Sequence, residues 1–483
     1  MLDFRPVGYV IGLMVTTLGF AMLLPLAVDL AEGRGHWPAF AESAILTALV
    51  GGLVALACRN GVREALTLQQ AFLLTTGVWV FLPLFGAMPF MLGATEARFV
   101  DALFESMSGL TTTGSTMFAG LDDLPKGLLL WRGMLQWLGG LGIVIVAIVF
   151  LPVMRVGGMQ FFVSEGFDTF GKVLPRTIDI SKGVLNVYLT LTMACVFVYV
   201  ALGMSVFDAT AHALTTISTG GFSTTDQSFA AFPGLPQYAC VVFMVLAGLP
   251  FVRLMQGVQG DLKPLWHDSQ ARAFLRWILY ALAAVVAYDI GIHGGEISEE
   301  RIRERLFNIV SIFTGTGYGD GDVTAWGVMP FIVLILVGAV GSCTGSTGCS
   351  IKVFRYEILF RAIRNQIRAI SHPHRTMVLR YGGRAVDDTV VQSVIFLFTV
   401  YILFFGFFSV ALQLTGLPLT ESITGAWTAI FNIGPAFGGL VGPTGALDAF
   451  PTTAKWLMIL AMLLGRLELV AVLVLLVPSF WKH

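Results

Sequence analysis

Seven long stretches of this sequence contain no charged residue. They are residues 6–28, 65–95, 133–154, 183–207, 227–252, 323–351 and 389–420. A transmembrane helix needs about 20 mostly apolar residues, so each stretch is long enough to span a membrane. Only 12% of the chain is charged, against roughly a quarter in soluble domains. The first stretch is too long and continuous for a signal peptide and is interpreted as the first span. The sequence therefore predicts an all-α integral membrane protein.

Basic residues are distributed unevenly among the connecting segments. Residues 155–182, 253–276 and 352–384 are rich in Lys and Arg, whereas residues 208–240 and 421–454 contain none. The positive-inside rule places the first group in the cytoplasm and the second group outside. The formal net charge of -1 gives no overall preference for polyanions, so no nucleic-acid partner is expected.

Four of the predicted outside segments share one pattern. Each follows a long span, starts with a short amphipathic stretch and ends in a Gly-containing, Ser/Thr-rich turn, and another span comes next. The turns centre on Gly114, Gly220, Gly317 and Gly434, which lie 106, 97 and 117 positions apart. The short stretches cannot cross a membrane, so they are predicted to be re-entrant helices. A unit of span, short helix, turn and span is therefore repeated four times.

These repeats define the expected fold class and domain organisation. We predict four span–pore helix–span repeats around a central pore, preceded by two extra transmembrane helices, ten spans in all. The expected boundaries are residues 1–60 for the extra helices and residues 61–157, 178–260, 270–370 and 385–483 for the repeats.

The turns have a composition suited to a carbonyl-lined cation filter. Non-helical backbone at membrane depth is tolerated where it lines a cavity, and rings of carbonyl oxygens can replace the hydration shell of K⁺. The short helices would point their negative dipole ends at the same axis. The third turn, with Thr316, Gly317 and Tyr318, is close to the Thr-Val-Gly-Tyr-Gly filter of tetrameric potassium channels. The expected K⁺ filter residues are Thr112, Thr113, Gly114, Ser218, Thr219, Gly220, Gly221, Gly315, Thr316, Gly317, Tyr318, Asn432, Ile433 and Gly434.

These turns, together with Asn432, Ile433, Gly434 and Pro435 in the fourth, resemble the Trk/Ktr/HKT superfamily of potassium transporters over essentially the whole chain. The ten predicted spans are most similar to bacterial TrkH membrane subunits. The resemblance implies that Gly114, Gly220, Gly317 and Gly434 form the narrowest ring of the filter. In the family a serine at the first position is associated with sodium preference, so glycine here favours K⁺ as the transported ion. Ala436 stands where the family often has another glycine.

Residues 338–350 form a Gly/Ser/Thr-rich run inside a predicted span. Such a run is not expected to remain a regular lipid-facing helix, although close helix packing through small residues is an alternative. The resemblance implies an intramembrane loop that obstructs the pore and moves on gating. The expected gate residues in it are Gly341, Thr344, Gly345, Ser346, Thr347 and Gly348. The preceding repeat has Gly248 and Pro250, which are expected to kink its span.

Arg466 and Glu468 are the only charges between Trp456 and Trp481. Intramembrane charges usually face the bundle interior or a cavity, so an internal ion pair that holds helices together is one interpretation. The resemblance implies the other, in which the arginine lies under the filter and raises the barrier for cations. We assign Arg466 to the gate.

Several other residues have plainer interpretations. Arg132 beside Trp131 is expected to be an interface anchor, and His212 a packing or hydrogen-bonding residue. The five cysteines, which show no metal-ligand spacing, are expected to be reduced. They are Cys58, Cys195, Cys240, Cys343 and Cys349.

The favoured function is channel-like potassium uptake across a bacterial inner membrane. One alternative is a proton- or sodium-coupled potassium symporter, which would use intramembrane acids such as Asp289 and Glu468. A remote alternative is a membrane enzyme, but the spans are nearly empty of His, Asp and Glu clusters. No nucleotide-binding fingerprint occurs, so no nucleotide is expected to bind this chain. The resemblance implies a homodimer and a cytoplasmic nucleotide-binding TrkA-type regulatory subunit, besides membrane lipid. The basic residues 352–384 could dock that subunit or serve only as a topology signal and lipid contact.

Overall fold

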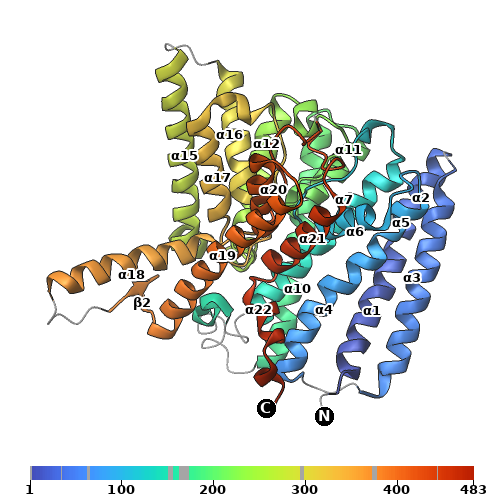
Figure 1. The fold of residues 1–483 in the computed structure, drawn as a ribbon, viewed down its shortest axis with the longest axis horizontal. Helices are drawn as coiled ribbons and strands as arrows, with labels where there is room; N and C mark the ends of the chain where they lie inside the picture. Colours follow the sequence, from blue (N-terminus) through green and yellow to red (C-terminus); the bar gives the residue numbers. More distant parts are fainter. Residues whose placement is uncertain are drawn as a thin grey trace.

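The protein is built almost entirely from helices. The computed structural model describes residues 3–33, 35–61, 66–150, 156–162, 173–293, 298–372, 378–442 and 444–482. In these residues the strands are confined to one antiparallel hairpin, in which β1 (Arg380–Tyr381) pairs with β2 (Arg384–Ala385). The prediction of an all-α protein is therefore confirmed (Figure 1). Residues 155 and 163–172 of the predicted cytoplasmic segment 155–182, and residues 373–377 of the segment 352–384, lie outside the described residues.

The first helices form a separate layer at one side of the molecule (Figure 1). They are α1 (Arg5–Ala21), α2 (Leu23–Glu32) and α3 (Trp37–Cys58). A Cβ atom built on Gly12 would lie 2.6 Å from the backbone nitrogen of Ala55, and one on Gly51 would lie 2.5 Å from that of Thr16. Small residues thus let α1 and α3 approach backbone to backbone, a common way of packing helices in membranes.

The rest of the chain repeats one order of elements four times. The long first helices are α4 (Leu68–Gly86, followed by α5, Met88–Leu92), α10 (Val173–Ala201), α15 (Ser269–His293, preceded by α14, Lys263–His267) and α19 (Asp388–Leu414). The short helices are α6 (Phe99–Leu110), α11 (Val206–Ile217), α16 (Glu299–Thr314) and α20 (Leu419–Phe431). The helices after the turns are α7 (Lys126–Ile145), α12 (Leu235–Gly248), α17 (Val328–Val340) and α21 (Thr452–Arg466).

The four units pack in a cycle. The helix that follows each turn contacts the short helix of the next unit: α7 contacts α11, α12 contacts α16, α17 contacts α20, and α21 contacts α6. The last contact joins the end of the chain to its first unit and closes the cycle. As a result, the four short helices are enclosed by the bundle and buried along most of their length.

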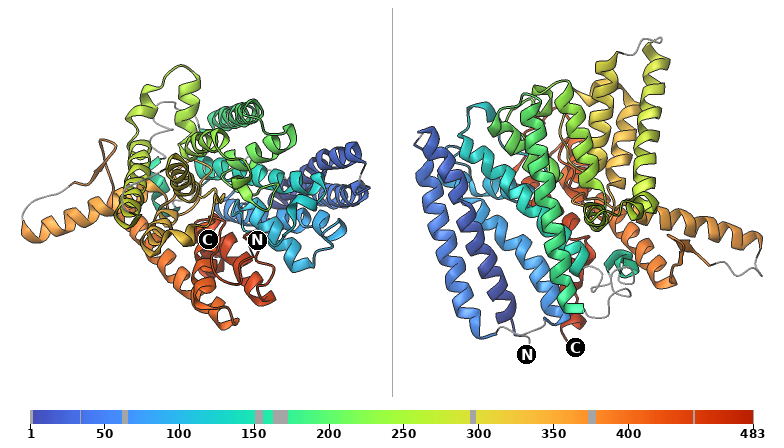
Figure 2. Two further views of the ribbon diagram at one scale, coloured as in Figure 1. Left: turned by 90° about the horizontal axis from the view of Figure 1, so that it is seen from above. Right: turned by 180° about the vertical axis from the view of Figure 1, so that it is seen from behind.

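Three of the helices that follow the turns are broken. The chain bends by 105° between α12 and α13 (Phe251–Val258), where Leu249 and Pro250 interrupt the helix, as expected from the sequence. It bends by 101° between α21 and the segment Val470–Leu476, which begins with α22 (Val470–Leu473). After α17, residues 341–352 separate the helix from α18 (Val353–Ser371), which projects from the body of the molecule (Figures 1 and 2).

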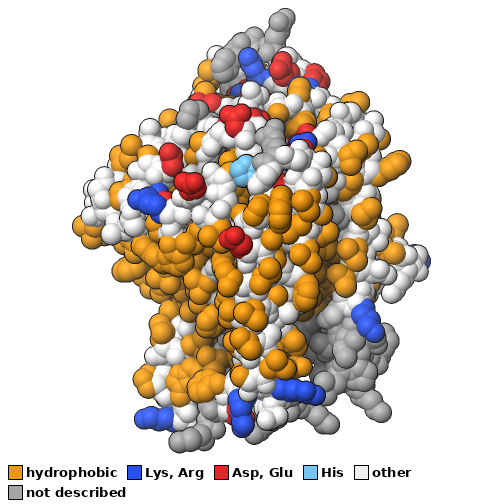
Figure 3. Space-filling model, turned by 90° about the vertical axis from the view of Figure 1, so that its right-hand side faces the viewer, with side chains coloured by type: hydrophobic (Ala, Val, Ile, Leu, Met, Phe, Trp, Pro, Cys, Tyr) orange, Lys and Arg blue, Asp and Glu red, His pale blue; other side chains and the backbone are white. Residues whose placement is uncertain are grey.

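The surface has the pattern of a multi-span membrane protein. Figure 3 shows a wide band of hydrophobic side chains, with acidic groups mostly toward the upper end and basic groups toward both ends. By length and apolarity, the described residues contain seven helices able to cross a membrane, or up to nine if each bent pair is one span. The tenth predicted span corresponds to α17, which has only 13 residues, and to the loop after it.

Candidate ion filter and gate

The four turns share one backbone conformation. In each, two residues separated by one position have a left-handed φ angle, and the second is always glycine. The pairs are Thr112 (52°) with Gly114 (88°), Thr219 (51°) with Gly221 (79°), Gly315 (78°) with Gly317 (79°), and Asn432 (52°) with Gly434 (108°). Left-handed backbone is costly for residues with a Cβ atom. We call Gly114, Gly221, Gly317 and Gly434 the ring glycines.

The ring glycines face one another around a closed circuit. A Cβ atom on Gly114 would lie 2.2 Å from the carbonyl oxygen of Gly220, and one on Gly221 would lie 1.9 Å from that of Thr316. A Cβ atom on Gly317 would lie 2.1 Å from the oxygen of Ile433, and one on Gly434 would lie 2.9 Å from that of Thr113. Each ring glycine thus lies against the carbonyl group that precedes the next one, and the fourth returns to the first.

The second turn differs by one residue from the predicted register. The sequence predicts Gly220 as the counterpart of Gly114, Gly317 and Gly434, but the left-handed φ angle and the position in the circuit belong to Gly221. Gly220 is buried and corresponds to Thr113, Thr316 and Ile433, which come just before the other ring glycines. Two adjacent glycines make the register ambiguous in the sequence, and the backbone conformation resolves it.

Hydrogen bonds from neighbouring side chains hold the turns in place. Asn432 donates from Nδ2 to Thr113 Oγ1 at 2.9 Å, and Ser115 Oγ donates to the carbonyl of Gly434 at 2.6 Å. The Thr316 hydroxyl lies 2.8 Å from that of Thr314. These contacts cross between units one and four as well as within unit three, so the turns support one another.

Tyr318 anchors the third turn to the second unit. Its hydroxyl lies within hydrogen-bonding distance of the hydroxyls of Thr215 and Thr216 and donates to the carbonyl of His212 at 3.1 Å. His212 itself contacts the carbonyl of Asp208 at 2.9 Å and Ser223 Oγ at 3.0 Å, as expected for a buried hydrogen-bonding residue. The Tyr318 side chain therefore ties the third turn to α11, while its carbonyl accepts from Ser311 Oγ at 2.8 Å.

One cavity opens on one side of the circuit. It has a volume of about 990 Å³, and all four ring glycines line it together with residues that follow the turns, including Ser223 and Phe437. Ala436 also lines this cavity rather than the circuit itself. We call this cavity the mouth. The ring glycines lie at its base, and residues from all four units line its walls.

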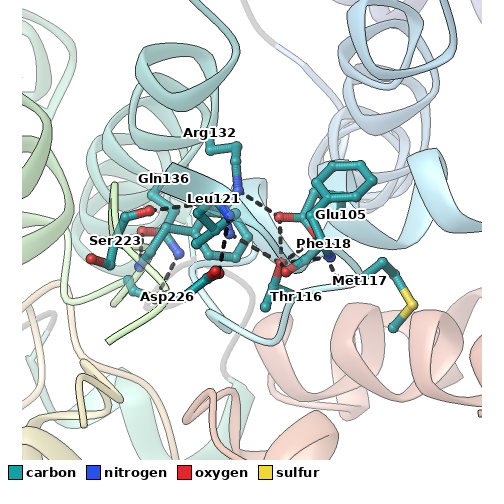
Figure 4. A network of polar contacts seen from close by, with 11 residues as sticks. Glu105, Thr116, Met117, Phe118, Leu121, Arg132, Gln136, Ser223 and Asp226 are labelled. Atoms are coloured by element: carbon teal, nitrogen blue, oxygen red, sulfur yellow. Dashed lines mark hydrogen bonds and ion pairs between the residues drawn. The ribbon is translucent and has the colours of Figure 1, made fainter. Parts of the chain in front are cut away.

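A polar network joins the first two turns beside this mouth (Figure 4). Arg132 on α7 forms a buried ion pair with Glu105 on α6, with 2.7 Å between Nε and Oε1. It also donates to the carbonyl of Ser223 at 2.8 Å and to Thr116 Oγ1 at 3.1 Å. The expectation that Arg132 anchors the membrane interface is wrong, because the side chain is 1% exposed and paired inside the protein. One turn further along α7, Gln136 contacts the backbone of the second turn.

The predicted gate residues lie in the loop of residues 341–352, which is buried throughout. Gly341 and Gly345 have left-handed φ angles of 74° and 75°. The carbonyl of Gly345 accepts from the Phe251 nitrogen, Thr347 donates to the carbonyl of Ala247, and the Thr344 nitrogen donates to Gln270. Ser346 donates to the carbonyl of Cys343 at 2.6 Å. The loop therefore docks against the break between α12 and α13.

The same loop lies at the ends of the short helices, on the side of the circuit away from the mouth. Ser342 Oγ donates to the carbonyl of Thr314, the last residue of α16, and Ser350 Oγ donates to that of Phe431, the last residue of α20. A Cβ atom on Gly348 would lie 2.8 Å from the Thr314 oxygen. Cys349 Sγ is 3.7 Å from Thr112 Oγ1 of the first turn. The loop thus occupies the space directly behind the circuit.

Arg466 reaches the same place from α21. Its side chain is buried and contacts Cys349 of the loop, while Nη2 donates to the carbonyl of Gly139 at 3.4 Å. Within the part of the chain that the structure describes, Nε has no hydrogen-bond partner. Glu468 does not pair with it, because its Oε2 is 2.6 Å from Arg355 Nη2. The interpretation of Arg466 and Glu468 as an ion pair is therefore wrong, and Arg466 has no acidic partner among the described residues.

Comparison with known proteins agrees with this architecture. The profile of the TrkH family, described as a cation transport protein, matches residues 36–483. The chain belongs to the TrkH family. It is 36% identical to the Trk system potassium uptake protein TrkI of Halomonas elongata over 480 residues, 99% of this chain and 97% of that protein. It is 31% identical to the Trk system potassium uptake protein TrkH of Escherichia coli K12, over 100% of both chains.

Its fold is also that of a solved TrkH structure. The crystal structure of the potassium transporter TrkH from Vibrio parahaemolyticus superposes with a TM-score of 0.91 at 30% identity, covering 99% of this chain and 100% of that one. Membership of the TrkH family identifies the chain as a multi-pass membrane transport protein and not an enzyme. In the described residues no group of three or more His, Cys, Asp or Glu side chains could hold a metal ion.

The sequence predicts most residues of the site but not the side chains that support them. The predicted turn residues do meet in one circuit, and the predicted loop and Arg466 meet behind it. Gln136, Glu105 and Arg355 were not singled out. Their polarity in apolar surroundings could have marked them as functional candidates, since Gln136 lies in an uncharged span and Glu105 lies inside a short apolar helix.

Proposed function

We propose that this chain conducts potassium ions across the bacterial inner membrane through the circuit of ring glycines. The observation that carries the proposal is the closed series of contacts in which each ring glycine lies against the carbonyl group of the next turn. Backbone carbonyls held around one axis can replace the water ligands of a dehydrated cation. The C-terminal ends of four buried helices add negative potential at the same point. The proposal includes ten spans and four repeats, at residues 61–157, 178–260, 270–370 and 385–483.

Potassium is the cation that the site and the relatives favour. Relatives that match this chain over nearly its full length are named potassium uptake proteins. The first ring position is Gly114 rather than the serine associated with sodium preference. The expected ligands are the carbonyl oxygens next to the ring glycines, from Thr113, Gly220, Thr316 and Ile433.

We assign gating to residues 341–352 and Arg466. The loop contacts the ends of α16 and α20, and Arg466 contacts the loop at Cys349. A permeating cation leaving the circuit on this side would meet a buried positive charge and a packed segment. Movement of the loop away from the α12–α13 break would remove both obstacles together, since the arginine and the loop are in contact.

Passive permeation is favoured over coupled symport. The two acids that could serve coupling are both neutralised: Asp289 pairs with Arg305 at 2.8 Å and Glu468 pairs with Arg355 at 2.6 Å. An acid whose charge is already balanced by a buried arginine is poorly placed to bind a second, coupling cation.

Regulation is proposed to come from other chains. Because no nucleotide-binding fingerprint occurs in this sequence, we propose a cytoplasmic nucleotide-binding subunit of the TrkA type, docked near the basic helix α18, and a homodimer of the membrane subunit. Arg361, Arg364 and Arg368 lie on α18, beside exposed apolar side chains such as Ile367 and Ile370.

Reconstitution tests the proposal. The purified protein in liposomes is expected to carry K⁺ and Rb⁺ faster than Na⁺ and Li⁺, and a Gly317→Ser variant is expected to lose that preference. Absence of flux calls for repetition with the cytoplasmic subunit added. Equal rates for all four ions in the wild type, or continued absence of flux with the partner present, would contradict the proposal.

A further inference from the structure

One of the four ring carbonyls is held differently from the others. The carbonyl oxygen of Gly220 accepts a hydrogen bond from Gln136 Nε2 at 2.6 Å. In the part of the chain that the structure describes, the carbonyl oxygens of Thr113, Thr316 and Ile433 accept no hydrogen bond. The circuit therefore has three carbonyls free of protein donors and one that is tethered to a side chain.

The Gln136 side chain is held rigidly because both its amide nitrogen and its amide oxygen form hydrogen bonds with the second turn. The side chain is fully buried, and Oε1 accepts from the backbone nitrogen of Phe222 at 3.0 Å. The amide thus bridges the residues on either side of the ring glycine Gly221. A Cβ atom on Gly220 would lie 2.3 Å from Gln136 Cδ, so the side chain packs directly on the turn.

The helix that carries Gln136 is itself fixed to both turns. Arg132 lies one helical turn before Gln136 on α7 and donates to the carbonyl of Ser223 in the second turn at 2.8 Å. It is also paired with Glu105, and the Glu105 carboxylate accepts from Thr116 Oγ1 at 3.0 Å and from the Met117 nitrogen at 2.8 Å (Figure 4). The position of the Gln136 amide is therefore determined by the first turn as well as by the second.

We propose that Gln136 is a positioning residue that sets ion selectivity by restraining the Gly220 carbonyl. The inference rests on the proposed filter function. A carbonyl held in place cannot move in to shorten its distance to Na⁺, and an oxygen that already accepts a hydrogen bond presents a weaker field to the ion. K⁺ selectivity has been explained by the size of the ion-binding cavity and by the field strength of the carbonyl ligands. The hydrogen bond from Gln136 keeps the cavity from shrinking and weakens the field of one ligand. Under either explanation it favours K⁺ over Na⁺.

The test compares three glutamine variants in liposomes. Gln136→Met removes both hydrogen bonds with little change in volume, whereas Gln136→Glu keeps an acceptor for the Phe222 nitrogen and loses the donor to Gly220. Gln70→Met is the matched control. Gln70 is 2% exposed, accepts from the Thr67 nitrogen at 2.9 Å and donates to the Asp3 carbonyl at 2.8 Å, far from the circuit. Initial rates of K⁺ and Na⁺ flux and the apparent melting temperature are measured for each protein.

We expect both Gln136 variants to lower the ratio of K⁺ to Na⁺ flux by about three- to tenfold, the size of one lost hydrogen bond. The Gln70 variant is expected to keep the wild-type ratio, even if its melting temperature falls. An unchanged ratio in Gln136→Glu, with wild-type K⁺ flux, would overturn the inference and leave the filter proposal intact. Wild-type protein without any preference for K⁺ would overturn both. If Gln136→Met does not fold, the Glu variant alone decides.

Discussion

At the residue scale, the circuit depends on four glycines, because a Cβ atom at any of their positions would meet a backbone carbonyl group. Each ring glycine has a left-handed φ angle and lies within 3 Å, at its Cβ position, of a carbonyl oxygen from the next turn. Any side chain there would meet both strain and a clash with backbone, which cannot swing aside as a side chain can. In the backbone of this chain, glycine is therefore the residue that fits these positions without displacing the neighbouring turn.

The first prediction concerns Gly221, where the structure and the sequence differ in register. Gly221→Ala is expected to lower selective K⁺ flux at least about tenfold, because the new methyl group would lie 1.9 Å from the Thr316 oxygen. Gly406→Ala is the control, since Gly406 is exposed in the middle of α19. A Cβ atom built on it would have no atom from outside its own stretch of helix within 4 Å. Flux rates in liposomes distinguish them. Equal activity of the two variants would contradict the assignment of Gly221 to the ring.

The second prediction concerns the buried pair of Arg132 and Glu105. Arg132→Leu leaves the Glu105 carboxylate buried without its partner and is expected to cost about 3–5 kcal/mol of stability. Arg98→Leu removes the exposed pair between Arg98 and Asp101 and is expected to cost less than about 1 kcal/mol. Thermal unfolding in detergent measures both. A melting temperature for the Arg132 variant as high as that of the Arg98 variant would count against a structural ion pair.

At this scale the sequence predicted which residue types form the turns. It did not predict the alignment of the second turn with the others or the partners of buried charged side chains. Glycine, threonine and asparagine in four turns indicated a filter, but adjacent Gly220 and Gly221 offered two alignments. Arg132 stands beside Trp131 and has the signature of an interface anchor, yet its partner Glu105 is 27 residues away. Such pairings depend on helix packing, which local sequence does not encode.

At the element scale, the helices after the turns are broken where the gate is proposed. Pro250 predicted the break between α12 and α13, and the Gly/Ser/Thr run predicted the loop of residues 341–352. The break after α21 has neither signal. There Glu468 and Leu469 adopt left-handed φ angles of 56° and 52°, which are unusual for these residue types. The buried pair of Glu468 with Arg355 accompanies this conformation, so tertiary contacts outweigh local preference.

The third prediction concerns the loop as a unit. Gly348→Ala introduces a methyl group 2.2 Å from Ser342 Oγ and 2.8 Å from the Thr314 oxygen, at the end of α16. We expect it to displace the loop from behind the circuit and to raise basal Rb⁺ flux at least about threefold. Rb⁺ uptake into liposomes without any cytoplasmic partner is the measurement. Unchanged basal flux in a variant of normal stability would contradict the role of this loop as the obstruction.

At the scale of the whole molecule, four unequal repeats form one ring because each repeat covers its neighbour. The contact of α21 with α6 joins the last unit to the first, and Lys455 of α21 bonds to Asp101 of α6 at 2.7 Å across that junction. The all-α class was predicted from the apolar stretches and is confirmed, and the four-repeat plan is a prediction from the spacing of the turns. The closure of the cycle and the projection of α18 did not, because they depend on contacts between distant parts of the chain.

The fourth prediction concerns the orientation of the chain. The distribution of Lys and Arg places the turn after α6 outside and the turn after α13 inside. In a Cys58→Ser background, Asp123→Cys is expected to react with a membrane-impermeant maleimide on intact spheroplasts. Gln259→Cys is expected to react only after permeabilisation. Both positions are exposed in the structure. The reverse labelling pattern would contradict the orientation.

The central claim is that the carbonyl groups beside the four ring glycines bind a dehydrated cation. The most direct test is a structure of the protein with Tl⁺ or Rb⁺ in place of K⁺, in which the heavy ion is located by its anomalous signal. The account predicts a peak on the axis of the circuit, coordinated by the carbonyl oxygens of Thr113, Gly220, Thr316 and Ile433. A structure with ions elsewhere in the protein and none within reach of these oxygens would contradict it.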